Sequence, residues 1–489
     1  MTDLNSLNLS IRPSSLIKKE GVEFGFLDSP SRTGLVILAP ADWKGLASFE
    51  GETVGQGDRI LMLCPLSIKN AIALRKHLPW LQPRTLGLQT SAGLGDRLGL
   101  ATPGHVRAIR ATHGKIAPIF AQQSMREMKR TGRSPQQVLS DATWGIFSEG
   151  WQKGFGADAD HLKTTQDIDD CLAVGFTFFT IDPGDHVNNR AETSSLSELR
   201  ELAGKLPVEI RSVDCGLKEQ RLRIEGLKFE FDETTLLKSA VKYGKAISHV
   251  ATMYRHLVSI AGNQPFELEI SIDETEQPTT HHEHVYIVHE LQHLGVQWVS
   301  LAPRYIGRFE KGVDYIGDPL KFERDLAGHA AIARHFGSYK LSLHSGSDKF
   351  SIYPALSRQT QGLVHIKTAG TSYLEALRTI AALDTNFIKE IYTFARQHYE
   401  SDKSSYHVSA KLSRAPLSES VANWAGLLEQ FDAREILHVT FGSVLQDKSG
   451  EGDRQFHERI IDFLKTNAEA YASNLEKHFN RHLTPFVTG

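Results

Sequence analysis

The sequence predicts an α/β fold: a closed (β/α)8 barrel of the TIM type, with a small β-rich N-terminal module and a helical C-terminal extension. Two observations predict the barrel. Short apolar runs bounded by turn residues alternate with stretches of helical periodicity, which is typical of parallel βα units. Eight such runs occur, and eight is the number that closes a barrel of this type.

The N-terminal module is expected to cover residues 1–80. Its apolar segments are short, Gly, Pro and Asp separate them, and one helical stretch at Ser67–His77 follows them. The expected strands are Phe24–Leu27, Leu35–Leu38 and Ile60–Leu63.

The barrel is expected over residues 81–384. Helix starts are legible between the strands, since Ser134-Pro135 precedes the helical stretch Val138–Gly150 and Ser372 precedes Tyr373–Leu383. The eight expected strands are Thr85–Ser91, Ile116–Ala121, Phe155–Asp160, Phe176–Asp182, Phe266–Asp273, Gln297–Ala302, Lys340–His344 and Gly362–Lys367.

Two further regions complete the chain. An insertion at about residues 188–233 is expected to add strands at Val208–Ser212 and Leu227–Phe231. Residues 385–489 are expected to form a helical extension that packs on the barrel and ends in the amphipathic stretch Gln455–His482. The run Ile436–Ser443 is compatible with a ninth strand or with a helical turn.

The composition excludes several classes of protein. With 55 Lys and Arg against 58 Asp and Glu, the net charge is −3, which disfavours binding to nucleic acid. The three cysteines are far apart and form no CxxC pair, so neither a disulfide framework nor a cysteine zinc site is expected. No stretch resembles a signal peptide or a membrane span. We therefore expect a soluble cytoplasmic protein, compatible with a homo-oligomer.

Carboxylates and imidazoles gather at five of the expected strand ends. In the strand around Glu269 the apolar side chains take the even positions, so Glu269, Ser271 and Asp273 are expected to point into the barrel. The same alternation sends four more side chains inward, Ser342, His344, His365 and Lys367, while two other strands end in Asp158, Asp160, His161 and Asp182. In a barrel of this type such ends form the site, so a metal or acid/base site is favoured.

The expected class of metal follows from the ligand types. Mixed imidazole and carboxylate ligands suit Zn, Mn, Co or Ni better than Ca, which prefers oxygen alone. The alternative for each histidine taken singly is a surface or hydrogen-bonded core residue.

A second metal motif competes with the strand ends. The segment His289-Glu290-Leu291-Gln292-His293 matches HExxH, the helical zinc motif of metallopeptidases, in which Glu290 would be the general base. Histidine is abundant nearby, at 281, 282 and 284, so an accidental match is a serious rival. The helix that carries the motif is also expected to face away from the barrel axis.

The segment Gly93–Gly99 falls short of a dinucleotide fingerprint. Its third glycine comes one residue late, and the next strand ends in Gln122-Gln123-Ser124, where a ribose-binding Asp or Glu would be expected. No NAD is therefore expected as a cofactor.

Several long motifs resemble those of the tagaturonate epimerase family. They are Gly95–His105, Phe155–Lys163, Asp273–Glu276, His344–Phe350 and His365–Gly370, and the resemblance spans about residues 20 to 485. It implies an isomerase that interconverts D-tagaturonate and D-fructuronate with a divalent metal. A sugar-acid-binding barrel without catalysis and the HExxH peptidase are the alternatives.

The chemistry of that epimerisation narrows the mechanism. The two sugars differ at the carbon β to the ketone, whose C–H is not acidified by the carbonyl, so simple α-proton exchange cannot invert it. Retro-aldol cleavage, rotation of the aldehyde and re-addition would do so, with a metal as Lewis acid. Transient oxidation is the other route and needs a nicotinamide, which the sequence does not support.

The inward alternation and the resemblance together assign roles. The metal ligands are expected to be His161, Asp273, His344 and His365, and the acid/base pair Asp160 and Glu274, with Asp158 and Asp182 in reserve. The sugar acid needs cationic and polar partners at the barrel mouth. The candidates for this binding are Arg97, Gln123, Lys349 and Lys367.

Overall fold

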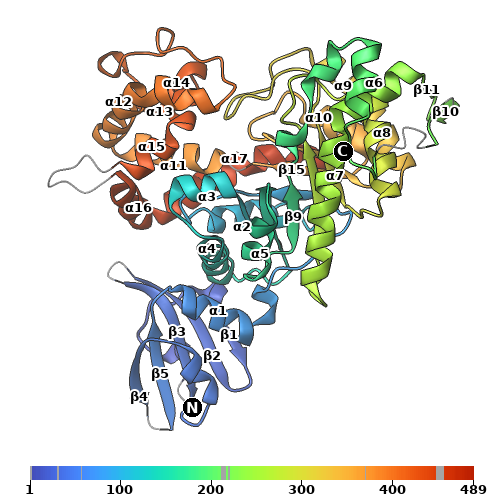
Figure 1. Cartoon of the computed structure of the whole chain (residues 1–489). Helices are drawn as coiled ribbons and strands as arrows, with labels where there is room; N and C mark the ends of the chain where they lie inside the picture. The colour runs from blue at the N-terminus through green and yellow to red at the C-terminus, as the bar shows by residue number, and fades with distance from the viewer. Residues whose placement is uncertain are drawn as a thin grey trace.

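The computed structural model describes residues 3–29, 32–56, 58–210, 216–218, 221–368, 370–447 and 456–488. It has three regions along the chain (Figure 1). An antiparallel sheet of N-terminal residues lies at one end, the barrel occupies the middle, and helices from the C-terminal part of the chain pack beside the barrel.

Eight parallel strands close into the predicted barrel, in the order β12-β13-β14-β15-β6-β7-β8-β9. Each strand is short, and nearly all of its side chains are buried, as expected where helices cover the outside and side chains fill the inside. The strands are β6 Ser91–Gly93, β7 Ala117–Ser124, β8 Gly156–Leu162, β9 Phe178–Ile181, β12 Glu267–Ile272, β13 Ser300–Pro303, β14 Lys340–Leu343 and β15 Val364–Lys367.

The expected first barrel strand is misplaced by six residues. β6 begins at Ser91, and the segment before it crosses the N-terminal end of the barrel instead. There Leu86 packs with Ala117, Ile119 and Phe178, and its N–H donates to the Glu267 carboxylate at 2.9 Å. An apolar side chain that fills the end of a barrel lies in the same kind of short apolar run as a strand residue, so the sequence does not distinguish the two cases.

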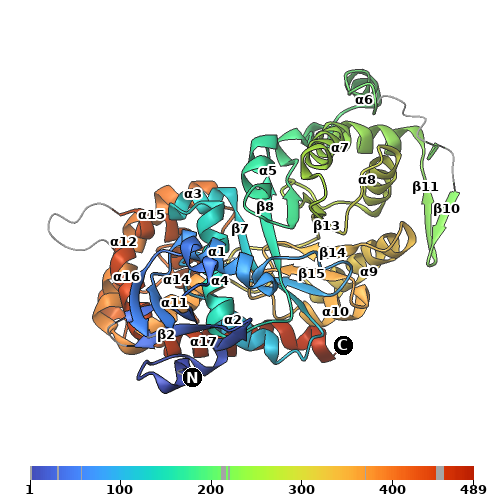
Figure 2. The ribbon, with the colours of Figure 1, turned by 90° about the horizontal axis from the view of Figure 1, so that it is seen from below.

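Helices surround the barrel (Figure 2). The helix start at Ser134 is confirmed, since its side chain accepts from Gln137 N–H and caps α4. Ser372 is not a cap, because α11 already begins at Thr371. The helices are α2 Thr102–Arg110, α3 Met125–Thr131, α4 Pro135–Ser148, α5 Thr165–Leu172, α6 Leu196–Ala203, α7 Glu233–Ala261, α8 His281–His293, α9 Pro319–His335, α10 Tyr353–Thr360 and α11 Thr371–Leu383.

The N-terminal sheet has the order β1-β2-β3-β5-β4 and contains the three expected strands. Alternating apolar residues of β2 and β3 pack against α1, whose start is capped by Ser67. Buried polar contacts join this sheet to the barrel, for example Arg75 Nη1 donating to Thr143 Oγ1 at 2.8 Å. The elements are β1 Ile17–Lys19, β2 Val22–Ser29, β3 Arg32–Pro40, β4 Glu52–Gln56, β5 Arg59–Cys64 and α1 Ile68–His77.

The insertion follows β9 and includes a two-stranded sheet. β11 (Leu227–Glu230) matches the second expected strand, and it pairs with β10 (Arg221–Ile224). The expected strand Val208–Ser212 is wrong for residues 208–210, where the main-chain oxygen of Pro207 accepts from Ile210 N–H in a turn. Residues 211 and 212 lie outside the described residues.

The C-terminal region is helical, as expected. The run Ile436–Ser443 lies on two helices, which settles its assignment against a ninth strand. The last helix, α17, packs against α2, α11 and α10 and so binds the end of the chain to the barrel. The helices are α12 Thr385–Asp402, α13 Trp424–Leu427, α14 Phe431–Val439, α15 Phe441–Gln446, α16 Phe456–Thr466 and α17 Ala468–Thr488.

A search of the described residues found no helix both long enough and apolar enough to cross a membrane.

Candidate active site

A β-bulge at the end of β8 brings two neighbouring side chains to the barrel mouth. Ala159 pairs with Phe179 and Leu162 pairs with Ile181, so the step between the two pairs is three residues on β8 but two on β9. The extra residue is His161, whose φ is +52°. Consecutive strand residues normally face opposite sides, and the bulge lets both Asp160 and His161 face the interior.

Below Asp160 and His161, the buried ammonium of Lys367 forms ion pairs with three carboxylates. Lys367 Nζ lies 2.6 Å from Asp160, 2.8 Å from Asp158 and 2.8 Å from Glu269. It also donates to Thr180 Oγ1 at 2.7 Å. A buried carboxylate is costly unless it is paired and hydrogen-bonded, and this ammonium pairs three of them at once.

The pKa values of Asp158 and Asp160 are shifted in opposite directions. Burial raises the pKa of Asp158 to about 7, and the negative charges of Asp160 and Glu269 add to this effect. Burial opposes the charge of Asp160 as well, but Lys367, His161 and His344 outweigh it and hold the pKa of this carboxyl below its usual value. Asp160 is therefore the ionised member of the pair at neutral pH.

His344 follows β14 and is oriented by a carboxylate. Its Nε2–H donates to Glu269 at 2.6 Å, which leaves Nδ1 facing the mouth, 3.5 Å from Asp273 Oδ1. Burial alone would lower the pKa of His344, but Asp273 and Glu269 raise it to about 10. The pocket thus favours a positive charge at this imidazole.

His161 is oriented in the same way by a different carboxylate. Its Nδ1–H donates to Asp182 at 3.2 Å, so its Nε2 faces inward, 3.8 Å from Asp160 Oδ1. The rings of His161 and His344 lie 5.1 Å apart. A carboxylate that holds one imidazole nitrogen while the other stays available is the usual arrangement around a metal-ligating histidine.

These groups fit a divalent metal. One donor atom each from Asp160, His161 and His344 lies within 4.8 Å of the others, and Asp273 borders His344. Donor atoms around a tetrahedral zinc lie about 3.3–3.5 Å apart, near the distances between these side chains. The distances of 3.5 and 3.8 Å are too long for good hydrogen bonds.

His365 lies one layer deeper than the other expected ligands. It pairs in register with Ser91 and Ser342, two residues before Lys367 on β15. Its Nδ1 lies 2.9 Å from Ser91 Oγ, and its ring packs beside Phe178. Burial lowers its pKa to about 3, so it is a neutral imidazole of the barrel interior.

Arg97 and Gln123 hold loops in place. Arg97 donates to Glu127 at 2.6 Å and lies 3.6 Å from the centre of the Phe441 ring, which ties the loop after β6 to α15. The terminal amide of Gln123 lies against main-chain oxygens, and in the orientation that turns its nitrogen toward them it donates to that of Asp96 at 3.2 Å. Gln122, one residue earlier, is the side chain that faces the barrel, and it donates to Asp160 at 3.0 Å.

The other two expected cations are fully engaged as well. The hydrogens of Lys367 are taken up by the carboxylates and Thr180. The Lys349 ammonium donates to three main-chain oxygens, those of Glu310 at 2.9 Å, Ser347 at 2.9 Å and Val313. Neither has a hydrogen left for a substrate, so the structure brings neither to the rim as a substrate partner.

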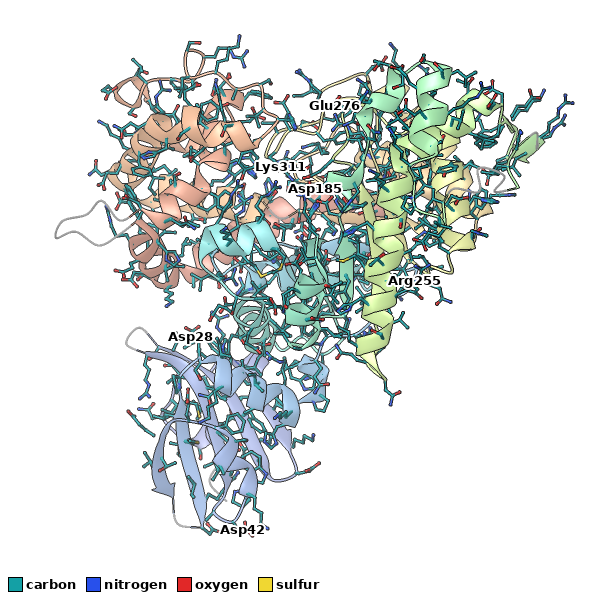
Figure 3. All side chains as sticks on the ribbon, in the orientation of Figure 1. Asp28, Asp42, Asp185, Arg255, Glu276 and Lys311 are labelled. Carbon is teal, nitrogen blue, oxygen red and sulfur yellow. The ribbon has the colours of Figure 1, made fainter. Side chains whose placement is uncertain are left out.

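Lys311 is the cation that the sequence reading missed. Lys311, labelled in Figure 3, lies in the long loop between β13 and α9. Its charge interacts with Glu127, Arg126, Asp273 and Glu274. Burial lowers its pKa. Its ammonium makes no hydrogen bond or ion pair with the residues that the structure describes. A loop of this length carries no periodic signal, so nothing in the sequence singled Lys311 out.

Glu274 lies at the rim beside the histidines. One of its carboxylate oxygens groups with His161 and Asp182, and Arg126 Nη2 lies 3.7 Å away. Its side chain is 42% exposed, in contrast to the buried Asp160. The mouth therefore presents the buried carboxylate of Asp160 and the accessible carboxylate of Glu274.

The HExxH residues do not form a comparable site. Glu290 is buried in α8, His293 is exposed, and His289 Nδ1 lies 3.6 Å from Glu290. Within the described ranges, neither histidine joins a group of three ligand atoms. The geometry favours the strand ends over this motif.

Comparisons with known proteins agree on one family. A family model described as tagaturonate epimerase matches residues 13–486. The chain is 46% identical over 470 residues to a tagaturonate/fructuronate epimerase of Thermotoga maritima, covering 95% of this chain and 94% of that protein. A crystal structure of a fructuronate-tagaturonate epimerase from Cohnella laeviribosi superposes with a TM-score of 0.92 at 36% identity, covering 99% of this chain and 97% of the other. A glycerol complex of the same Cohnella laeviribosi epimerase gives 0.91 at 37% identity, with 98% and 96% covered.

Proposed function

Because this chain belongs to the tagaturonate epimerase family, we propose that it interconverts D-tagaturonate and D-fructuronate by inverting the carbon β to the ketone. The observation that carries the proposal is the pair of imidazoles at the barrel mouth. Glu269 holds one nitrogen of His344 and Asp182 holds one nitrogen of His161. The second nitrogen of His344 lies beside Ser271 and Asp273, and that of His161 lies beside Asp160.

The proposed reaction is a retro-aldol cleavage and its reversal. The hydroxyl on the inverted carbon gives its proton to a base and becomes an aldehyde, while the bond to the neighbouring carbon breaks. The electron pair of that bond passes into an enediolate formed with the ketone. The aldehyde then turns its other face, the bond re-forms, and the proton returns to the new hydroxyl.

The residues that would hold a divalent metal are His161, His344 and Asp273, with Asp160 beside them. A metal bound there would supply a Lewis acid for the ketone and its neighbouring hydroxyl. We leave His365 out of this ligand set because it lies one layer deeper in the barrel.

Asp160 and Glu274 are the proposed acid/base residues. Asp160 is ionised, and Gln122 and Lys367 hold its two oxygens in position, which suits a base of fixed geometry. Glu274 is accessible at the rim and can exchange its proton with solvent. Lys367 also keeps the buried charge around Asp160 balanced.

Lys311 is the proposed partner of the substrate carboxylate. It is a cation at the rim without an ion pair among the described residues, and its charge interacts with those of Asp273 and Glu274 at the mouth. A carboxylate placed among several acids needs such a partner. Arg126, half exposed beside Glu274, is the second cation within reach.

The test compares two histidine substitutions. His344→Asn should abolish epimerisation of D-tagaturonate and remove about one bound metal per chain. His293→Asn, on the outer helix α8, should leave both unchanged. Activity is followed by NMR of the two sugars, and metal is measured by mass spectrometry after desalting. Full activity and full metal content in His344→Asn would exclude the proposed site.

A further inference from the structure

A second group of histidine and carboxylate side chains lies outside the mouth, between α8 and α9. Donor atoms of His281, Asp325 and His329 all lie within 4.8 Å of one another. His281 starts α8, and the other two are one turn apart on α9, so they face the same side of that helix. Figure 2 shows the two helices on the outside of the barrel.

The spacing within this group is that of metal ligands. His281 Nε2 lies 3.5 Å from Asp325 Oδ1, and His329 Nε2 lies 3.7 Å from Asp325 Oδ2. Both distances exceed a good hydrogen bond, about 2.7–3.2 Å. They are close to the separation of about 3.3–3.5 Å between donor atoms around a tetrahedral zinc.

Two of the donor atoms are buried and unsatisfied. His329 is fully buried, and its Nε2 and Asp325 Oδ2 have no hydrogen-bond partner within the part of the chain that the structure describes. Buried polar atoms are nearly always paired, so two that face each other indicate a ligand.

The surroundings prepare His329 as a neutral ligand. Its other nitrogen, Nδ1, lies 2.9 Å from Nδ1 of His284, and His284 Nε2 lies 2.7 Å from the Tyr339 hydroxyl. When His329 Nδ1–H donates to His284 Nδ1, and His284 Nε2–H donates to the Tyr339 hydroxyl oxygen, the ring lone pair of His329 lies on Nε2 and points toward Asp325. Such outer hydrogen bonds fix the tautomer of metal-binding histidines.

We propose that His281, Asp325 and His329 form a second site for a divalent cation of the zinc class, distinct from the barrel mouth. His281 Nε2–H donates to the main-chain oxygen of Asp325 at 2.9 Å, and binding exchanges this hydrogen bond for a bond to the cation, with the ring proton moving to Nδ1 of the same imidazole. Two nitrogens and one oxygen suit zinc, cobalt or nickel better than calcium or magnesium. The side chains of His281 and Asp325 are 27% and 19% exposed, which gives solvent the fourth position.

The site would brace the barrel rather than take part in the reaction. It joins α8 to α9, the helices that follow β12 and β13. Thr279, just before α8, also exchanges two hydrogen bonds with Arg304 after β13. Bound metal would therefore stabilise the folded chain without reaching the substrate.

Zinc binding to the full-length protein tests the proposal. The protein is stripped with a chelator, loaded with zinc, desalted and analysed by mass spectrometry. His281→Gln and Asp325→Asn should each lose about one zinc per chain relative to the parent and keep epimerase activity. His293→Gln, on the same helix but outside the group, should lose none. Zinc content equal to the parent in both His281→Gln and Asp325→Asn would overturn the proposal.

A second measurement separates this site from the barrel mouth. In the His344→Asn background, zinc should still raise the melting temperature, and it should not do so once His281→Gln is added. The melting temperature does not depend on epimerisation, so this measurement tests the second site even if the proposed mechanism at the mouth is wrong. A melting temperature that responds equally to zinc in the single and double variants would overturn the second site.

Discussion

Lys349 holds the loop that carries Lys311. Its ammonium donates to the main-chain oxygens of Glu310 and Val313, on either side of Lys311, and to that of Ser347. Lys349 is completely buried, whereas Lys311 reaches the barrel mouth. One lysine thus fixes the backbone that carries the other, for which we propose contact with the substrate.

Removing the charge of Lys311 should weaken substrate binding. Lys311→Met should raise the KM for D-tagaturonate by about 10- to 100-fold, because a charge-assisted hydrogen bond is worth about 1.5–3 kcal/mol. The effect on kcat should be smaller, since the reacting carbons lie elsewhere. Lys321→Met, an exposed lysine on α9, is the control in steady-state kinetics. An unchanged KM would rule out this role.

Lys349 should affect binding without touching the substrate. Lys349→Met leaves three main-chain oxygens without their donor, so we expect lower stability in urea and a KM raised in the same direction as in Lys311→Met. The double variant should be no worse in KM than Lys311→Met alone, because both act through one loop. Additive effects of the two substitutions on KM would contradict this.

Lys367 should be the most sensitive position for stability. Lys367→Met removes the ammonium that pairs with Asp158, Asp160 and Glu269, which we expect to cost about 3–5 kcal/mol of unfolding free energy. Adding Asp158→Asn removes one of the charges and should recover part of the loss. Urea denaturation measures both, and equal stability of parent and Lys367→Met would refute the account.

Asp182 should tune the affinity of the proposed mouth metal. Asp182→Asn keeps the shape but weakens the hold on His161 Nδ1–H, so metal affinity should fall about 10- to 100-fold. The matched control is Asp185→Asn, three residues on and exposed (labelled in Figure 3), whose carboxylate pairs with Lys163. Competition with a chelating dye gives both affinities, and equal values would count against the ligand role of His161.

The protein should lose stability at alkaline pH through Glu435. Burial, with the neighbouring Glu310 carboxylate, raises the pKa of Glu435 to about 8. The folded state therefore binds this proton more tightly than the unfolded state does. Its contribution is complete below about pH 4.5 and is lost as pH rises through 8. Glu435→Gln should raise the melting temperature more at pH 9 than at pH 6, and an equal difference at both values would contradict the prediction.

The barrel was predictable because each of its strands is a short buried run flanked by turn residues. Seven expected strands share at least half of their residues with observed ones, whereas Thr85–Ser91 shares only Ser91 with β6, because Leu86 fills the end of the barrel instead. The alternation of apolar and polar residues also predicted that Glu269, His344 and Lys367 share the interior. Alternation of apolar and polar residues determines which face of a strand a side chain takes, so it can predict which side chains point into the barrel.

The roles of individual charges were not predictable in the same way. Lys349 and Lys367 were expected at the substrate, but their partners come from distant segments that no local pattern connects to them. Lys311 was missed for the opposite reason, since its loop has no pattern at all. Orientation within a strand is a local property, whereas the partner of a buried charge depends on the closed fold.

The backbone at His161 has an evolutionary consequence. A residue with a side chain at positive φ costs about 1 kcal/mol relative to glycine, so selection for stability alone would favour glycine at this bulge. Glycine would also delete the imidazole that Asp182 orients. Relatives that keep the reaction should therefore retain a histidine here, and relatives that have drifted to another chemistry should be free to regain glycine and the stability it brings.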